Sequence, residues 1–108
     1  MEQIVKISYF ANSQMAHLSK ILYDEEYFGF LENAEDYVLQ IVDFIYTIPV
    51  RKRKLCKNPR RGKFFCSLKH NRTTTWFISF DMEDGFYIVK NICNNHSKDY
   101  VEFIAGGL

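Results

Sequence analysis

The chain has 108 residues, of which 47% are hydrophobic and 17% aromatic, and its formal net charge is +1. This length predicts one domain, residues 1–108, with one buried core and no room for a second. No window approaches the roughly 18 apolar residues of a membrane span, and the N-terminus lacks the features of an export signal. The three cysteines, Cys56, Cys66 and Cys93, form no CxxC pair, which does not fit a disulfide framework. We therefore expect a cytoplasmic protein with no membrane association.

The first half of the chain predicts one strand and two helices. Residues 4–10 are rich in β-branched and aromatic types and predict the strand. Ser13 can cap a helix that ends before Gly29, and Asn33 can cap a second helix that Pro49 ends. Apolar residues recur at helical spacing in both segments. They are Met15, Leu18, Ile21 and Leu22 in the first, and Ala34, Tyr37, Val38, Ile41, Ile45 and Ile48 in the second.

The second half predicts three strands, residues 63–69, 72–81 and 86–92. The first two strands alternate, so that one face of each carries a set of apolar side chains. These sets are Phe64, Cys66 and Leu68, and Trp76, Ile78 and Phe80. His70-Asn71 can turn the chain between the first two strands, and Asp84-Gly85 is a hairpin signal between the last two. A tail from Asn94 to Ile104 can be helical.

The predicted fold is therefore α+β, in the order β-α-α-β-β-β. Two helices pack on one face of a mainly antiparallel four-stranded sheet, and the opposite face stays free for a ligand. The pattern does not decide which face the helices cover. Phe65, Phe77 and Tyr87 alternate away from the face of Trp76, where they either stack on bases or form a second covered side.

Although the net charge is small, the basic and acidic residues are strongly segregated along the chain. Residues 1–50 hold two basic and eight acidic groups, residues 51–72 hold ten basic and no acidic groups, and residues 73–108 hold two and five. A block of this kind is typical of a polyanion contact, because each neutralised phosphate releases a condensed counterion. The alternative is a solvated loop between the second helix and the sheet. RNA is the partner that we expect.

The order of elements resembles the RelE/ParE superfamily of type II toxin-antitoxin toxins. The closest likeness lies in the stretches 74–80, 87–90 and 94–96. The resemblance implies a toxin that inhibits growth and is neutralised by an antitoxin protein. It acts either as a metal-independent endoribonuclease on ribosome-associated mRNA, of the RelE kind, or as a non-catalytic inhibitor of DNA gyrase, of the ParE kind. A degenerate relative that retains only antitoxin binding is a further alternative, and no cofactor is expected.

The resemblance also implies site residues. RelE-like ribonucleases use basic residues beside the sheet, an arginine in the strand region and a His or Tyr near the C-terminus. The matching positions here are Arg60, Arg61, Lys63, Arg72, His96 and Tyr100. Many members carry an arginine further into the strand that follows Arg72, where this chain has Thr74 and Thr75.

When RNA is cleaved by attack of its own 2′-hydroxyl, the reaction needs a base for that hydroxyl, an acid for the leaving 5′-oxygen and cations for the charge of the phosphorane. His96 suits proton transfer, and Tyr100 would share its side of a helical tail. Arg61, Lys63 and Arg72 would hold the phosphate. The alternatives are an exposed turn residue for His96 and a core anchor for Tyr100. We expect these groups and the cations from Arg51 to Arg72 to converge in one cleft.

The remaining cations are predicted to bind and steer RNA. They are Arg51, Lys52, Arg53, Lys54, Lys57, Arg60 and Lys69. For those that follow the second helix, the alternative is a favourable interaction with the helix dipole.

Zinc is a weaker alternative. Cys66, His70, Cys93 and His96 supply four ligands of suitable type, but their spacing matches no common structural site. We therefore predict no metal.

Overall fold

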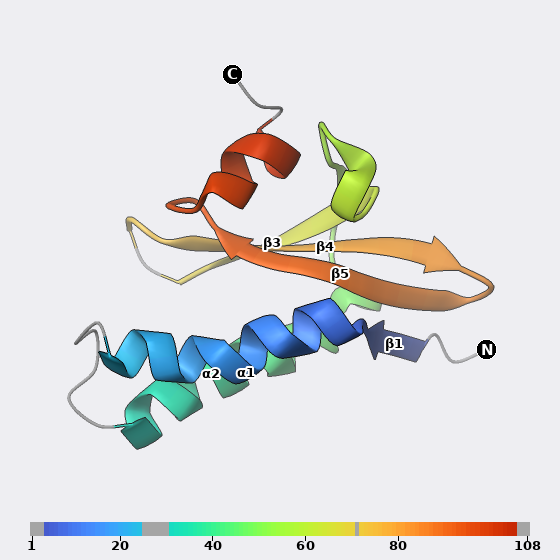
Figure 1. Ribbon diagram of the computed structural model, residues 1–108. Helices are drawn as coiled ribbons and strands as arrows, with labels where there is room; N and C mark the ends of the chain where they lie inside the picture. Colours follow the sequence, from blue (N-terminus) through green and yellow to red (C-terminus); the bar gives the residue numbers. More distant parts are fainter. Residues whose placement is uncertain (1–3, 25–30, 71, 106–108) are drawn as a thin grey trace.

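The computed structural model describes residues 4–24, 31–70 and 72–105. Their elements follow the predicted order, with one extra short strand and three short helical turns (Figure 1). The elements are β1 (Ile4–Ile7), α1 (Tyr9–Asp24), α2 (Leu31–Ile45), η1 (Ile48–Val50), β2 (Lys54–Leu55), η2 (Pro59–Arg61), β3 (Phe64–Lys69), β4 (Thr75–Glu83), β5 (Phe86–Asn94) and η3 (Tyr100–Ile104).

The sheet has five strands in the order β1-β5-β4-β3-β2. β1 runs parallel to β5, and the other pairs are antiparallel. The prediction of four strands is wrong, because the basic stretch itself contributes β2 along the outer edge of β3. The first predicted strand is also too long. It ends at Ile7, and Ser8 caps α1 by accepting a hydrogen bond from the Ala11 N–H at 3.1 Å.

α1 and α2 cover one face of the sheet, as predicted (Figure 1). This is the face of Trp76, Ile78 and Phe80, which the sequence left undecided. α2 begins at Leu31, so Asn33 lies within the helix rather than before it. The predicted stripe positions whose side chains lie outside the described part are Ile21, Leu22 and Ala34, and Gly29 and Asn71 lie there as well.

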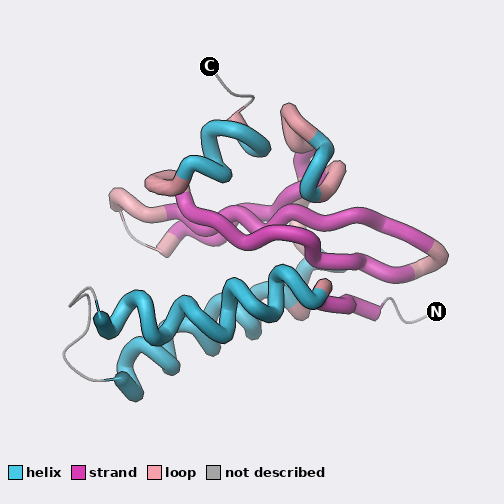
Figure 2. The backbone as a smooth tube through the Cα atoms, viewed as in Figure 1, coloured by secondary structure: helices cyan, strands magenta, loops and turns pink. Residues whose placement is uncertain are grey.

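The opposite face, which we call the far face, is partly covered, so the expectation that it stays free is wrong. η2 and η3 lie over it (Figure 2). Arg61 of η2 lies over the ring of Phe103 of η3 at 5.7 Å, and a second apolar cluster holds η3 there. Its members are Cys56, Cys93, Ile104, Phe65, Phe77 and Tyr100. The sequence offered a second covered side and an anchored tail only as alternatives, for Phe65 and Phe77 and for Tyr100.

Tyr87 is a further correction. It is 4% exposed, belongs to the core beneath the helices, and its ring lies 5.8 Å from that of Phe80. The two-residue hairpin pairs Tyr87 with Met82, so an odd-numbered residue of β5 shares a face with even-numbered residues of β4. A β-bulge at Ser79/Phe80 then shifts the register again.

No helix in the described residues is long and apolar enough to cross a membrane.

Candidate nucleic-acid interface

The end of the sheet where β3 meets β4 carries His96 and Arg72 together. His96 follows β5, and its Nε2 lies 3.4 Å from Thr74 Oγ1. Arg72 stands in the β3–β4 turn, two residues before Thr74, and is exposed. The Asn95 side chain ties the two segments, since its Oδ1 accepts from the Thr75 N–H at 2.9 Å and its Nδ2 donates to the Thr73 carbonyl at 2.9 Å. We call this region the histidine end.

His70 lies at the same end. Its backbone N–H donates to the Thr74 carbonyl at 2.9 Å, so it stands across the turn from Thr74. Its ring meets the ring of Tyr37 edge-on, with centroids 4.3 Å apart. The sequence interpretation used His70 only as a turn residue and a zinc alternative. No signal in the sequence could have found it, because the connection between β3 and β4 is too long to fix the register that sets His70 opposite Thr74.

Tyr100 is not beside His96 on one face of a helix. His96 lies in a turn, where its N–H bonds Asn94 Oδ1 at 2.9 Å, and the helical turn η3 begins only at Tyr100. The Tyr100 ring is half-buried and lies 4.8 Å from the ring of Phe77 on the far face. Tyr100 therefore anchors the tail on the sheet, which was the alternative that the sequence offered.

A first group of exposed cations runs along the outer edge of β3. Lys54 pairs with Phe65, and the Lys52 carbonyl accepts a hydrogen bond from Cys66 Sγ at 3.3 Å. Lys69 pairs with Thr75, which brings the row to the histidine end. We call this group, with Arg72, the β3 border. Its members are Arg51, Lys52, Arg53, Lys54, Lys69 and Arg72.

Aromatic rings hold the two arginines of the border. The Arg51 guanidinium lies over the ring of Phe44 at 5.2 Å, and its Nε donates to Thr47 Oγ1 at 2.9 Å. The Arg53 guanidinium lies over the ring of Phe64 at 5.4 Å. Such contacts orient a guanidinium and leave its charge in place. The two arginines also favour the thiolate of nearby Cys66, although burial is the larger effect and raises the pKa of that thiol.

The second group of cations, in and around η2, lies elsewhere. Its members are Lys57, Arg60, Arg61 and Lys63. Arg61 stacks on Phe10 at 4.3 Å, and the Lys63 N–H donates to Asp81 Oδ1 at 2.8 Å. Asp81 is seven residues along β4 from Thr74, or roughly 23 Å at the usual rise of a strand. The ten cations of the basic block therefore do not converge, and Arg61 and Lys63 do not meet His96.

The cysteines do not form a reactive or metal-binding site. Cys66 belongs to the core beneath the helices, whereas Cys93 lies in the far-face cluster, so the two cannot share a zinc ion. Burial raises the pKa of the Cys56 thiol to about 11 and that of the Cys93 thiol to about 12, which keeps both protonated at neutral pH. In the described part of the chain, no three His, Cys, Asp or Glu side chains are grouped closely enough to hold a metal.

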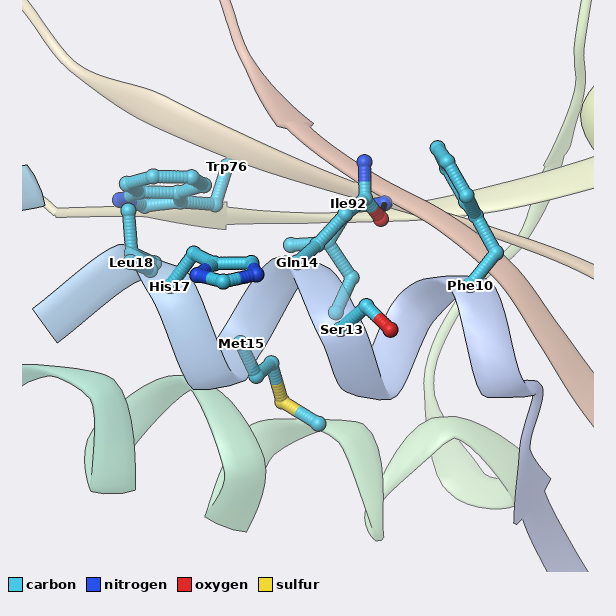
Figure 3. A pocket seen from close by; sticks show the side chains of 8 residues that line it. All are labelled: Phe10, Ser13, Gln14, Met15, His17, Leu18, Trp76 and Ile92. Carbon is cyan, nitrogen blue, oxygen red and sulfur yellow. Dashed lines mark hydrogen bonds between the residues drawn. The ribbon is translucent and has the colours of Figure 1, made fainter.

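A pocket of about 370 Å³ opens between α1 and the sheet (Figure 3). Its lining residues are Phe10, Ser13, Gln14, Met15, His17, Leu18, Trp76 and Ile92. β1 pairs with β5 only as far as Val89, and beyond that point Gln14 replaces the missing strand. Its Oε1 accepts from the Ile92 N–H at 2.8 Å, and its Nε2 donates to Asn91 Oδ1 at 2.7 Å. The surface that these residues expose to the pocket is almost entirely apolar, so the pocket does not suit a polyanion.

Comparison of the chain with protein-family models, with curated proteins and with solved structures found no match.

Proposed function

We propose that the protein binds RNA along the β3 border and cleaves it at the histidine end, as a toxin of the RelE kind that an antitoxin neutralises. The observation that carries the proposal is a group of six exposed cations beside β3 and in the β3–β4 turn, which extends to the end of the sheet where His96 lies. Pairing with β3 and contacts with aromatic rings fix part of this group in place.

The basic side chains and the nearby imidazole have complementary roles in this proposal, since the first would bind phosphate and the second would transfer protons. Basic side chains along a strand edge suit a phosphate backbone, because phosphate contacts supply affinity and position the nucleic acid without reading its sequence. Arg72 lies two residues before Thr74, and the His96 ring contacts Thr74, so both side chains belong to the same end of the sheet. Histidine is the usual general acid or base near neutral pH. The products would carry a 2′,3′-cyclic phosphate and a 5′-hydroxyl.

Binding is tested with a fluorescent single-stranded RNA, by anisotropy at several salt concentrations. If each border cation meets one phosphate, the slope of log K against log salt is about −4, because one contact on a single strand contributes about −0.7. The double variant Lys52→Gln/Lys54→Gln should weaken binding and flatten the slope by about 1.4. The control Lys57→Gln/Arg60→Gln removes the same charge from the η2 group and should leave the slope unchanged. A control that flattens the slope as much as the border variant places the RNA elsewhere.

Cleavage is tested in cells and in solution. Induction should inhibit growth and produce new mRNA ends, and His96→Ala should abolish both while the circular dichroism spectrum stays that of the folded protein. Purified protein should cleave RNA in the presence of EDTA. Intact messages together with halted replication would point instead to the gyrase inhibitor of the ParE kind. A fully toxic His96→Ala variant would rule out the role assigned to His96.

A further inference from the structure

The histidine end holds two imidazoles that flank one residue of β4. His70 stands on one side of Thr74, bonded through its N–H to the Thr74 carbonyl, and His96 stands on the other, with Nε2 3.4 Å from Thr74 Oγ1. The three positions continue the row Lys69, Thr75 and Asn95 by one residue. Thr74 therefore lies between the His70 backbone and the His96 ring.

Half-buried Tyr37 and buried Trp76 support the His70 ring. Its edge-on contact is with Tyr37 of α2, and the Tyr37 hydroxyl accepts a hydrogen bond from Trp76 Nε1 at 2.7 Å. Trp76 is 5% exposed and belongs to the core. His70 itself is exposed. A ring supported on one side and open on the other is oriented for a ligand, whereas a ring that only filled a core gap would be covered.

We propose that His70 and His96 are the two proton-transfer groups of the cleavage site, with Arg72 as the cation on the phosphate. This inference rests on the proposed function and names the machinery of that site. It gives His70 the second proton-transfer role, for which the sequence had suggested Tyr100. The ring of Tyr100 is engaged with Phe77 on the far face, while His70 lies on the same row as His96.

The reaction balances with these groups alone. One imidazole takes the proton of the 2′-hydroxyl, and the 2′-oxygen forms a bond to phosphorus. The P–O5′ bond breaks, and the other histidine, protonated beforehand, gives its proton to the departing 5′-oxygen. The products are a 2′,3′-cyclic phosphate and a 5′-hydroxyl, and exchange with water restores both histidines. The Arg72 charge lies beside the negative charge that builds up on the phosphoryl oxygens.

The test uses the purified full chain and a labelled single-stranded RNA. His70→Ala and His96→Ala should each lower the cleavage rate by at least about 100-fold, a usual contribution of general acid–base catalysis, with RNA affinity unchanged. His70→Gln keeps a planar polar side chain over Tyr37 and should lose as much activity as His70→Ala. The chain offers a matched control in its third histidine: His17→Ala, on α1, should cleave at the wild-type rate.

A substrate with a 5′-bridging sulfur separates a chemical role from a structural one. Sulfur leaves without a proton, so this RNA should restore cleavage to the variant that lacks the acid and not to the variant that lacks the base. Rescue of both variants or of neither would overturn the inference. Cleavage by the wild type that needs His96 but proceeds at full rate in His70→Gln would overturn the role of His70 alone. A wild-type protein that binds no RNA and cleaves none would refute the proposed function itself.

Discussion

Gly62 joins η2 to β3 at a point where the backbone passes very close to the sheet, so replacing it should destabilise the protein. It has φ +115°. A Cβ atom added there would lie 2.7 Å from the Phe80 nitrogen, and 3.0 Å from both the carbonyl carbon and the Cβ of Ser79. Two of these three are backbone atoms of β4 and cannot turn aside as the end of a flexible side chain would. Gly62→Ala must therefore shift η2 away from the sheet or strain the strand.

Gly85 supplies a matched control, because it also has a positive φ, +82°, but nothing lies within 4 Å of an added Cβ. A positive φ costs a residue with a Cβ at least about 1–2 kcal/mol, and both alanine variants carry a cost of this kind. Overpacking adds about 1–3 kcal/mol for Gly62→Ala alone. We expect losses in the free energy of unfolding of about 1–2 kcal/mol for Gly85→Ala and about 2–5 kcal/mol for Gly62→Ala.

Urea denaturation followed by tryptophan fluorescence measures both losses, because Trp76 is the single tryptophan and lies in the core. Comparable m-values in the two variants would show that the difference arises in the folded state. Equal losses in the two variants would refute the close approach of Gly62 to β4. The Gly62→Ala variant should still bind RNA, since the β3 border does not pass through η2.

Two further predictions concern the core and its edge. Gln14→Leu leaves the Ile92 N–H and Asn91 Oδ1 without their partner. In urea melts, the free energy of unfolding should fall by about 1–3 kcal/mol for each buried group left unpaired. The control Ser13→Ala, on the same helix, should change it by no more than about 0.5 kcal/mol. The Cys93 thiol has a pKa of about 12 in the folded protein against an ordinary value of 9.0, so the folded state holds the thiol proton more tightly than the unfolded state does. Above pH 9 the free energy of unfolding should therefore fall by up to about 1.4 kcal/mol per pH unit because of this thiol. Cys93→Ala should show a shallower decline between pH 9 and pH 11 than the wild type, and an unchanged decline would mean that the thiol is not buried.

Local periodicity accounts for what could be predicted of the fold. The alternation of apolar residues placed the last three strands within three residues of their observed bounds, because the exposure of a strand residue depends on its immediate neighbours. The side of the sheet on which Tyr87 lies could not be predicted from local periodicity. It depends on the two-residue hairpin, which pairs Glu83 with Phe86, so counting odd and even residues across the turn gave the wrong side. The sequence offered a covered far face only as an alternative for Phe65 and Phe77, because their partners include Cys56 and the tail, which are distant along the chain.

The spatial arrangement of the cations also could not be predicted from their order in the sequence. The basic block is continuous from Arg51 to Arg72 in sequence, and that continuity suggested one cleft. In space the chain reverses between β2 and β3, because Cys56 bonds back to the Lys63 carbonyl and Gly62 presses η2 onto β4. The residues inside this reversal are carried away from the histidine end, and those outside it line up along β3. A count of cations therefore overstates the surface that one RNA strand can touch.

The histidine end was only half predicted from the sequence, because it depends on the register of three strands. His70 and His96 are separated by 25 positions and by two strands, and neither belongs to a recognisable motif. They meet Thr74 because β3, β4 and β5 form an antiparallel meander, and His70, Thr74 and His96 all lie beyond the last paired residues at one end of these strands. Pairs of this kind follow from register, not from spacing. A sequence gives the register only where a tight turn sets it, as at Asp84-Gly85, and the connection from β3 to β4 is longer than that.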